Sequence, residues 1–281
     1  MNKAVIAGVN VYQRPGCNLR GCINDVTNMR DILMRFYGFK AEDIRVVTDE
    51  RATKANIMAR LDWLVTGNKE GDRLLFHFSG HGSQVRDRDG DELSDRLDEL
   101  ICPTDMNFDG IYILDDDLRG VFSKLAPGVI CDVILDSCHS GTGTREFVEE
   151  PCSGWKMEGA PDEYIKPRYM EPPIDFLSRY DVNDDLPVKK VLRAMENGME
   201  AMNHCLFAGC RDNQTSADAY INNTYNGAMT YYLCKTIRNA GGKITRKELV
   251  RLTNASLLYN RYFQTPQLEG NINKLNLNFL S

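Results

Sequence analysis

The amino-acid sequence predicts an α/β fold built on a mainly parallel central sheet. Apolar runs of strand length alternate, along the first two-thirds of the chain, with segments whose apolar residues recur at helical spacing. Strands separated by helices usually pair in parallel through right-handed crossovers. A chain of 281 residues can also bury a sizeable core. We therefore expect one large domain, residues 1–281.

The N-terminal half supplies strands and helices in turn. Residues 4–11 read as a strand, and residues 24–36 have apolar side chains at helical spacing. Thr53 is a suitable N-cap for a helix that passes through Leu61 and ends near Gly67. Three aspartates at 115–117 favour the start of a helix that runs through Leu125. The other predicted elements are strands at 44–48, 74–79 and 129–135, and a hairpin of 100–102 with 111–114.

The pattern breaks after the strand at 129–135. Residues 142–187 hold more than half of the prolines and many charges, which predicts a long surface excursion. Regular structure returns with a strand at 204–210, helices at 227–238 and 246–259, and a short strand near 267–268.

Composition excludes several classes of function. The net charge is −6 and the pI is near 5.4, which disfavours nucleic acid and anionic membranes as partners. No apolar stretch approaches the ~20 residues needed to span a membrane, and the N-terminus reads as a strand rather than a signal peptide. The nine cysteines are an odd number and several lie in apolar runs, which favours a reducing cytoplasm.

A histidine and a cysteine follow two of the apolar runs. His81 comes just after the strand at 74–79, and Cys138 comes just after the strand at 129–135. Residues past the carboxyl ends of adjacent parallel strands meet in one crevice, where ligands bind. A thiol beside an imidazole can perform nucleophilic acyl transfer, with the backbone amides of Gly82 and Cys138 as oxyanion donors. The alternative is a packed core cysteine and a loop histidine.

Four sequence blocks resemble one known family. The motifs FSGHG at 78–82 and DSCHSG at 136–141 are similar to the catalytic pair of metacaspases and bacterial orthocaspases, the caspase-like cysteine peptidases of clan CD, family C14. LRGCIND at 19–25 and DELICPTD at 98–105 resemble further blocks of that family. The resemblance implies the caspase–haemoglobinase fold, with helices on both faces of the sheet and an added hairpin. It divides the domain into a p20-like part, 1–141, a linker, 142–203, and a p10-like part, 204–281.

The resemblance also implies roles for single residues. Cys138 would be the nucleophile and His81 the general base and acid. A substrate pocket (S1) that accepts Arg or Lys would be lined by four residues: Cys22, Asp25, Ser79 and Asp136. Paired carboxylates attract a guanidinium and repel the aspartate that true caspases accept. Alternatively, Asp25 is a helix N-terminal charge and Asp136 a strand-end hydrogen-bonding group.

Calcium is an expected cofactor by resemblance alone. Asp98, Asp115 and Asp116 match three aspartates of the family's regulatory calcium site. The family's further aspartate would fall near Arg145, which is a departure from the pattern. The acidic run at 87–99 is not an EF-hand, because Glu92 stands where the loop requires glycine.

Self-processing is a further expectation, because a protease specific for Arg or Lys could cut its own exposed linker. The candidate positions are Arg145, Lys166, Arg168, Arg179, Lys189, Lys190 and Arg193. The alternative is that these are solubilising surface charges.

The sequence thus predicts a cytoplasmic, monomeric cysteine endopeptidase acting on protein or peptide substrates with Arg or Lys before the cleaved bond. One alternative is a non-catalytic signalling scaffold with the same fold. A metal-binding protein using the cysteines ranks low, because the sequence has no Cys-x-x-Cys motif.

Overall fold

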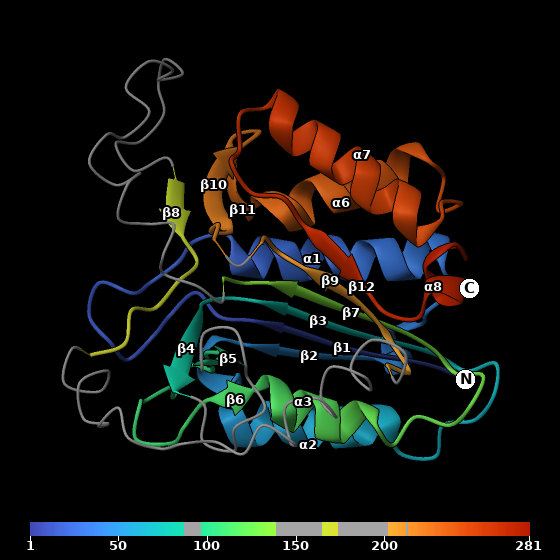
Figure 1. The fold of residues 1–281 in the computed structure, drawn as a ribbon, viewed down its shortest axis with the longest axis horizontal. Coiled ribbons are helices and arrows are strands. Elements are labelled where there is room, and N and C mark those ends of the chain that lie inside the picture. The colour runs from blue at the N-terminus through green and yellow to red at the C-terminus, as the bar shows by residue number, and fades with distance from the viewer. Residues whose placement is uncertain (87–96, 139–164, 174–201, 212) are drawn as a thin grey trace, which may run out of the picture.

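Six strands form the central sheet in the order β12-β9-β7-β3-β1-β2 (Figure 1). The computed structural model describes residues 1–86, 97–138, 165–173, 202–211 and 213–281. All neighbours pair in parallel except β12, which is antiparallel to β9, so the predicted fold class is confirmed. The strands are β1 (Asn2–Gly8), β2 (Ile44–Thr48), β3 (Arg73–Ser79), β7 (Ile130–Asp136), β9 (Cys205–Ala208) and β12 (Gln267–Glu269).

Helices cover both faces of this sheet, as Figure 1 shows. The helices α1 (Cys22–Phe36), α6 (Ala228–Asn239) and α7 (Arg246–Tyr259) lie on one face, and α2 (Lys54–Val65) and α3 (Asp115–Phe122) lie on the other. Thr53 caps α2 and Thr245 caps α7, each accepting a hydrogen bond from a first-turn amide. Short helical turns at Ala41–Asp43, Asp49–Arg51 and Ile272–Leu275 (α8) complete the helices of the described residues.

Two hydrophobic cores lie on either side of the sheet, and the alternation of side chains along each strand assigns residues to them. In β1, Val5 and Ala7 pack with α2 and α3, whereas Ala4 and Ile6 pack with α1 and α6. Strands buried on both faces are mostly apolar, which is why apolar runs of strand length marked them as strands.

Two small antiparallel sheets stand beside the carboxyl ends of the central strands (Figure 1). One contains β4 (Gly82–Arg86), β5 (Leu97–Ile101) and β6 (Ile113–Leu114), and the other contains β8 (Ile165–Pro167), β10 (Ala217–Ile221) and β11 (Thr224–Gly227). The predicted hairpin corresponds to β5 and β6, whose register pairs Leu100 with Leu114.

Several predicted boundaries and strands were wrong. The first strand ends at Gly8 rather than at residue 11, and α3 ends at Phe122 rather than at Leu125. The strands β4, β8, β10 and β11 were not predicted. Within the described residues, no helix is both long and apolar enough to cross a membrane.

Candidate active site

The register of the two central strands brings His81 and Cys138 to the same edge of the sheet. Ser79 at the end of β3 pairs with Asp136 at the end of β7, so the histidine and the cysteine each lie two residues beyond a paired position. Both side chains are buried. The backbone segments that follow β3 and β7 lie very close together. A Cβ atom on residue 82 would overlap the carbonyl oxygen of Cys138, so only glycine fits at this position.

An internal segment of the chain, residues 165–170, passes through this edge. The amides of Gly82 and Cys138 both donate to the carbonyl oxygen of Arg168, over 3.0 and 3.1 Å. The amide of Arg168 donates to the carbonyl of Ser216 over 2.9 Å, and that of Met170 donates to the carbonyl of Gly82 over 2.9 Å. Two amides converging on one carbonyl oxygen are the donor arrangement of an oxyanion hole.

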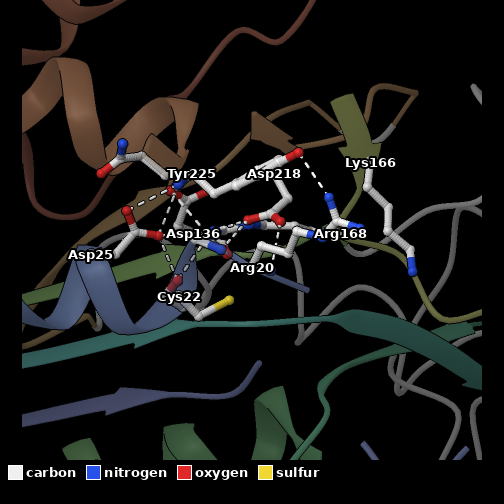
Figure 2. A network of polar contacts seen from close by, with 12 residues as sticks. Arg20, Cys22, Asp25, Asp136, Lys166, Arg168, Asp218 and Tyr225 are labelled. Atoms are coloured by element: carbon white, nitrogen blue, oxygen red, sulfur yellow. Dashed lines mark hydrogen bonds and ion pairs between the residues drawn. The ribbon is translucent and has the colours of Figure 1, made fainter. Parts of the chain in front are cut away.

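The side chain of Arg168 enters a pocket of carboxylates (Figure 2). Its Nη2 lies 2.8 Å from Asp25 and 3.0 Å from Asp218. Its Nη1 donates to Ser79 Oγ over 2.8 Å and to the Asp136 carbonyl oxygen over 3.1 Å, and lies 3.4 Å from the Asp136 carboxylate. The guanidinium therefore has four acceptor residues around its two terminal nitrogens. We call this set, Asp25, Ser79, Asp136 and Asp218, the acidic pocket.

Each carboxylate of the acidic pocket is itself held by neighbouring donors. Asp25 accepts from Ser79 Oγ and from the amide of Gly227. Asp136 accepts from Ser216 Oγ and from the amide and hydroxyl of Thr230. The Asp218 carboxylate accepts hydrogen bonds from the backbone amides of Arg20 and Gly21. Because these donors fix the oxygens in place, the pocket is preorganised for a cation.

Burial dominates the electrostatics of the acidic pocket. Arg168 is 0% exposed, and so are Asp25 and Asp136. Burial raises the pKa of Asp25 to about 7, although Arg168 acts in the opposite direction. Burial alone would lower the pKa of Arg168, but the carboxylates of Asp136, Asp25 and Asp218 raise it above its ordinary value, so the guanidinium stays charged. One guanidinium faces three carboxylates here, so removing that cation would leave buried carboxylates without a counter-ion.

Two further residues shape the pocket by their size and position. A Cβ atom on Gly227 would overlap Asp136 and the Arg168 guanidinium, so a glycine is required there. Cys22 is buried beside the guanidinium, and burial raises the pKa of its thiol. Cys22 is therefore a neutral wall residue rather than a reactive thiol.

Burial favours the uncharged forms of both the thiol and the imidazole. Cys138 Sγ accepts from the amide of Ser216 over 2.6 Å and donates to its carbonyl over 3.4 Å. His81 Nε2 bonds to the carbonyl of Cys17 over 2.7 Å, and its ring packs on Tyr12. Burial raises the pKa of Cys138 well above its usual range and lowers that of His81 to about 4. His81 Nδ1 has no hydrogen-bond partner within the described residues.

Most residues singled out from the sequence gather at this edge. The acidic pocket contains three of the four predicted pocket residues, and the fourth, Cys22, lies against it. The expectation that Arg168 lies on an exposed excursion was wrong: its charge is buried because three carboxylates from distant parts of the chain surround it. Lys166 is described as well, and the other candidate cleavage positions lie outside the described residues, namely Arg145, Arg179, Lys189, Lys190 and Arg193.

The predicted calcium ligands are not gathered into a metal site by the described residues. Asp115 and Asp116 both pair with Arg119 in the first turn of α3, and Asp98 lies on β5 at the same end of the small sheet. No group of three or more His, Cys, Asp or Glu side chains suited to a metal ion occurs in that part of the chain.

Sequence reasoning missed Asp218, Ser216 and Gly227. Asp218 and Gly227 belong to the hairpin of β10 and β11, which was not predicted, and Ser216 directly precedes it. Its turn residues, Asn222 and Asn223, both have positive φ (52° and 65°), as a two-residue hairpin turn requires. The Asn-Asn pair was the signal that could have revealed this hairpin and its aspartate, because asparagine tolerates positive φ.

Comparison with known proteins settles the family. The family model described as "Metacaspase, peptidase C14 domain" matches residues 2–145, which include His81 and Cys138. The chain belongs to the metacaspase family. This metacaspase is 34% identical to Metacaspase-1 of Emericella nidulans over 302 residues, covering 99% of the chain and 72% of the relative. It is 32% identical to Metacaspase-1 of Meyerozyma guilliermondii, covering 95% of the chain and 69% of the relative.

Solved structures share the fold of this metacaspase. A protein from Geobacter sulfurreducens matches with a TM-score of 0.68 at 23% identity, covering 100% of the chain and 98% of that protein. Caspase-1 from Spodoptera frugiperda matches with a TM-score of 0.56 at 13% identity, covering 96% and 86% respectively. The predicted caspase-like fold and the prediction of a cysteine peptidase are therefore both confirmed.

Proposed function

We propose that this metacaspase hydrolyses peptide bonds on the carboxyl side of arginine, with Cys138 as nucleophile and His81 as general base and acid. The observation that supports this most is the position of Arg168. Its carbonyl oxygen accepts hydrogen bonds from the amides of Gly82 and Cys138, and its guanidinium lies in the acidic pocket. An arginyl residue of a substrate bound in the same way would present its carbonyl carbon next to Cys138.

The proposed reaction uses groups that are already in place. The amides of Gly82 and Cys138 stabilise the negative charge that develops on the carbonyl oxygen. His81 removes the thiol proton as Cys138 attacks, and returns it to the leaving amine. Because Sγ is bonded to Ser216, the Cys138 side chain must rotate before it attacks.

The acidic pocket favours arginine over lysine. Its acceptors are arranged so that both terminal nitrogens of a guanidinium can donate to them at the same time: Nη1 to Ser79, and Nη2 to Asp25 and Asp218. A lysine ammonium offers one nitrogen, so it leaves part of this set without a donor. Each buried acceptor without a donor lowers the binding free energy of the lysyl peptide, and the carboxylates of the pocket would repel an aspartate side chain.

A panel of fluorogenic tetrapeptides that differ only at the residue before the cleaved bond tests the proposal. We expect the arginyl peptide to be hydrolysed at least about tenfold faster in kcat/KM than the lysyl peptide, the difference arising from unsatisfied acceptors. We expect no turnover of the aspartyl peptide. Equal rates for arginine and lysine would contradict the proposed geometry, and a preference for aspartate would overturn the proposal.

Binding of a guanidinium-like ligand should depend on pH through Asp25. In a Cys138→Ala, Arg168→Ala double variant, loss of the cation removes the interaction that lowers the pKa of Asp25, so that pKa lies above about 7. Benzamidine binding then releases a proton, and its Kd should fall several-fold from about pH 7 to about pH 8.5. Calorimetry measures this, and adding Asp25→Asn should abolish the pH dependence. An unchanged slope in that variant would contradict the assignment to Asp25.

Self-processing, calcium activation, a cytoplasmic location and a monomeric state are the remaining parts of the proposal. The eight cysteines of the described residues are all free, which supports a reducing compartment. Running the peptide panel with and without a calcium chelator tests the calcium requirement. Indifference to the chelator would remove calcium from the proposal and leave the peptidase assignment intact.

A further inference from the structure

We infer that Gln264 is a positioning residue of this peptidase. Its side-chain amide holds Ser216, and Ser216 in turn holds both the main chain of the substrate and the carboxylate of Asp136. Gln264 lies between α7 and β12, where sequence reasoning singled out no residue. The inference rests on the proposed function, because the substrate contacts in question are those that Arg168 makes.

The side-chain amide of Gln264 is buried and uses its acceptor and both of its donors. Gln264 is 4% exposed. Its Oε1 accepts from the backbone amide of Ala217 over 3.0 Å, and its Nε2 donates to the carbonyl of Gly209 over 3.0 Å and to Ser216 Oγ over 3.1 Å. Because the backbone N–H of Ala217 can only donate, the oxygen must face it, which fixes the orientation of the amide. The side chain therefore joins the end of β9 to the start of β10.

Ser216 is the residue through which this amide reaches the active site. Its carbonyl accepts from the amide of Arg168 over 2.9 Å, and a substrate arginine bound in the same way would make this main-chain hydrogen bond. Its hydroxyl donates to Asp136 Oδ1 over 3.0 Å, and its own amide donates to Cys138 Sγ over 2.6 Å. One residue thus contacts the peptide main chain, the acidic pocket and the nucleophile.

Gln264 determines the direction of the Ser216 hydroxyl. A hydroxyl has one proton to donate, and an N–H group of Gln264 points at its oxygen. The oxygen therefore accepts from Gln264, and its proton is left for Asp136 Oδ1. Without this N–H group the hydroxyl loses the partner that makes its direction unique, and Asp136 loses a fixed donor.

Gln264 also fixes the main chain at Ser216 and Ala217. Packing is tight here, because a Cβ atom on Gly209 would come within 2.4 Å of the Ser216 hydroxyl oxygen. Removing Gln264 Oε1 would leave the buried amide of Ala217 without its acceptor, which is unfavourable, so the chain would shift to pair that amide elsewhere. Such a shift moves the Ser216 carbonyl away from the amide of the bound peptide.

Gln214 provides the matched control, because it joins the same two segments of the chain through other partners. Its Oε1 accepts from the amide of Thr265 over 2.8 Å, and its Nε2 donates to Thr265 Oγ1 over 3.2 Å. If Gln264 only held this loop in place, removing either glutamine should have a similar effect on the active site.

Two arginyl peptides that differ in a single group test the inference. In one of them an ester oxygen replaces the nitrogen of the arginine, so nothing donates to the Ser216 carbonyl. We expect wild type to cleave the amide peptide after arginine at least about tenfold faster in kcat/KM than the ester peptide, because a buried acceptor loses its donor. In Gln264→Met, which keeps the side-chain length, this ratio should fall to about threefold or less. Gln214→Met should keep the wild-type ratio.

The ratio of two peptides on one variant is independent of how much of that protein is folded. It is also independent of how often the variant's own Arg168 occupies the site, because both peptides compete for the same free enzyme. A second ratio, arginyl over lysyl peptide, reports the link to Asp136. Ser216→Ala should lower this second ratio and keep the amide-to-ester ratio, whereas Gln264→Met should lower both. Adding Gln264→Met to Ser216→Ala should not lower the second ratio further.

The outcomes separate this inference from the proposed function. An unchanged amide-to-ester ratio in Gln264→Met, or an equal fall in Gln214→Met, would overturn the inference and leave the peptidase assignment intact. If wild type hydrolyses no arginyl peptide, the proposed function fails and the inference with it. If thermal melting shows that Gln264→Met does not fold, Gln264→Glu takes its place, since it keeps an oxygen for Ala217 but has no N–H group for Ser216. That variant should lower the arginyl-to-lysyl ratio, and an unchanged ratio would equally overturn the inference.

Discussion

Replacing Cys138 with alanine is expected to lower kcat/KM for arginyl peptides by at least about a thousandfold. The nucleophile and its base act as a unit, so His81→Ala should cost a similar factor, and the double variant should be no slower than either single one. Initial rates with a fluorogenic arginyl peptide measure all three. The same substitution decides between a peptidase and a non-catalytic scaffold, because a scaffold has no turnover to lose.

Cys131→Ala provides the matched control for this experiment. Cys131 is also a buried cysteine of β7, but it lies near the start of the strand, away from the oxyanion donors. We expect near wild-type kcat/KM with a modest loss of stability from the missing sulfur. Residual activity of Cys138→Ala at the level of the control would exclude Cys138 as the nucleophile.

Removing Arg246 is expected to cost about 3–5 kcal/mol of folding free energy. Asp132 of β7 is completely buried and accepts from Arg246 Nε and Nη2, over 2.5 and 2.8 Å, and from the amide of Leu280 over 3.0 Å. Burial raises the pKa of Asp132, and Arg246 opposes that rise. Arg246→Met therefore leaves a buried carboxylate without its counter-ion, and α7 loses its charged anchor to the catalytic strand.

Urea denaturation of Arg246→Met and Arg251→Met measures this difference. Arg251 lies on the same helix, but it is exposed and pairs with Glu248 at the surface, so its loss should lower the denaturation midpoint much less than the loss of Arg246. A double variant, Asp132→Asn with Arg246→Met, should recover part of the stability, because no charge is left buried alone. Equal midpoints for the two single variants would show that the buried pair contributes no more than the exposed one.

Elements with a strong local pattern were predictable from sequence. Helix α7 begins at Arg246 and ends at Tyr259, as predicted, because Thr245 caps it and its apolar residues keep helical spacing. The central strands were found from their apolar runs, since β3 and β7 are mostly apolar, with His77 and Asp132 as the polar residues inside them. The convergence of His81 and Cys138 then followed from a general property of parallel sheets, without any long-range information.

The acidic pocket was only partly predictable, because it depends on contacts between distant residues. Asp25 and Asp136 stand next to recognisable blocks, whereas Asp218 lies in a short strand with no strong alternation. Arg168 is the sharper example. A proline-rich, charged segment normally lies at the surface, and burying its guanidinium is favourable only where three carboxylates from separate elements meet. The composition of the segment around Arg168 cannot predict this, because the three carboxylates come from elsewhere in the sequence.

Residues 165–170 lie as a strand between β10 and β4, and in the proposed reaction a substrate takes this position, which limits the polypeptides that can be cut. Its hydrogen bonds come from the main chains of Ser216 and Gly82, so a target must offer several consecutive residues with unpaired amides and carbonyls. An arginine inside a helix or a central strand has no such groups free, and exposing them requires local unfolding of the target. We therefore expect the turnover of a given protein to follow how often its arginine-bearing segments open, more closely than how many arginines it contains.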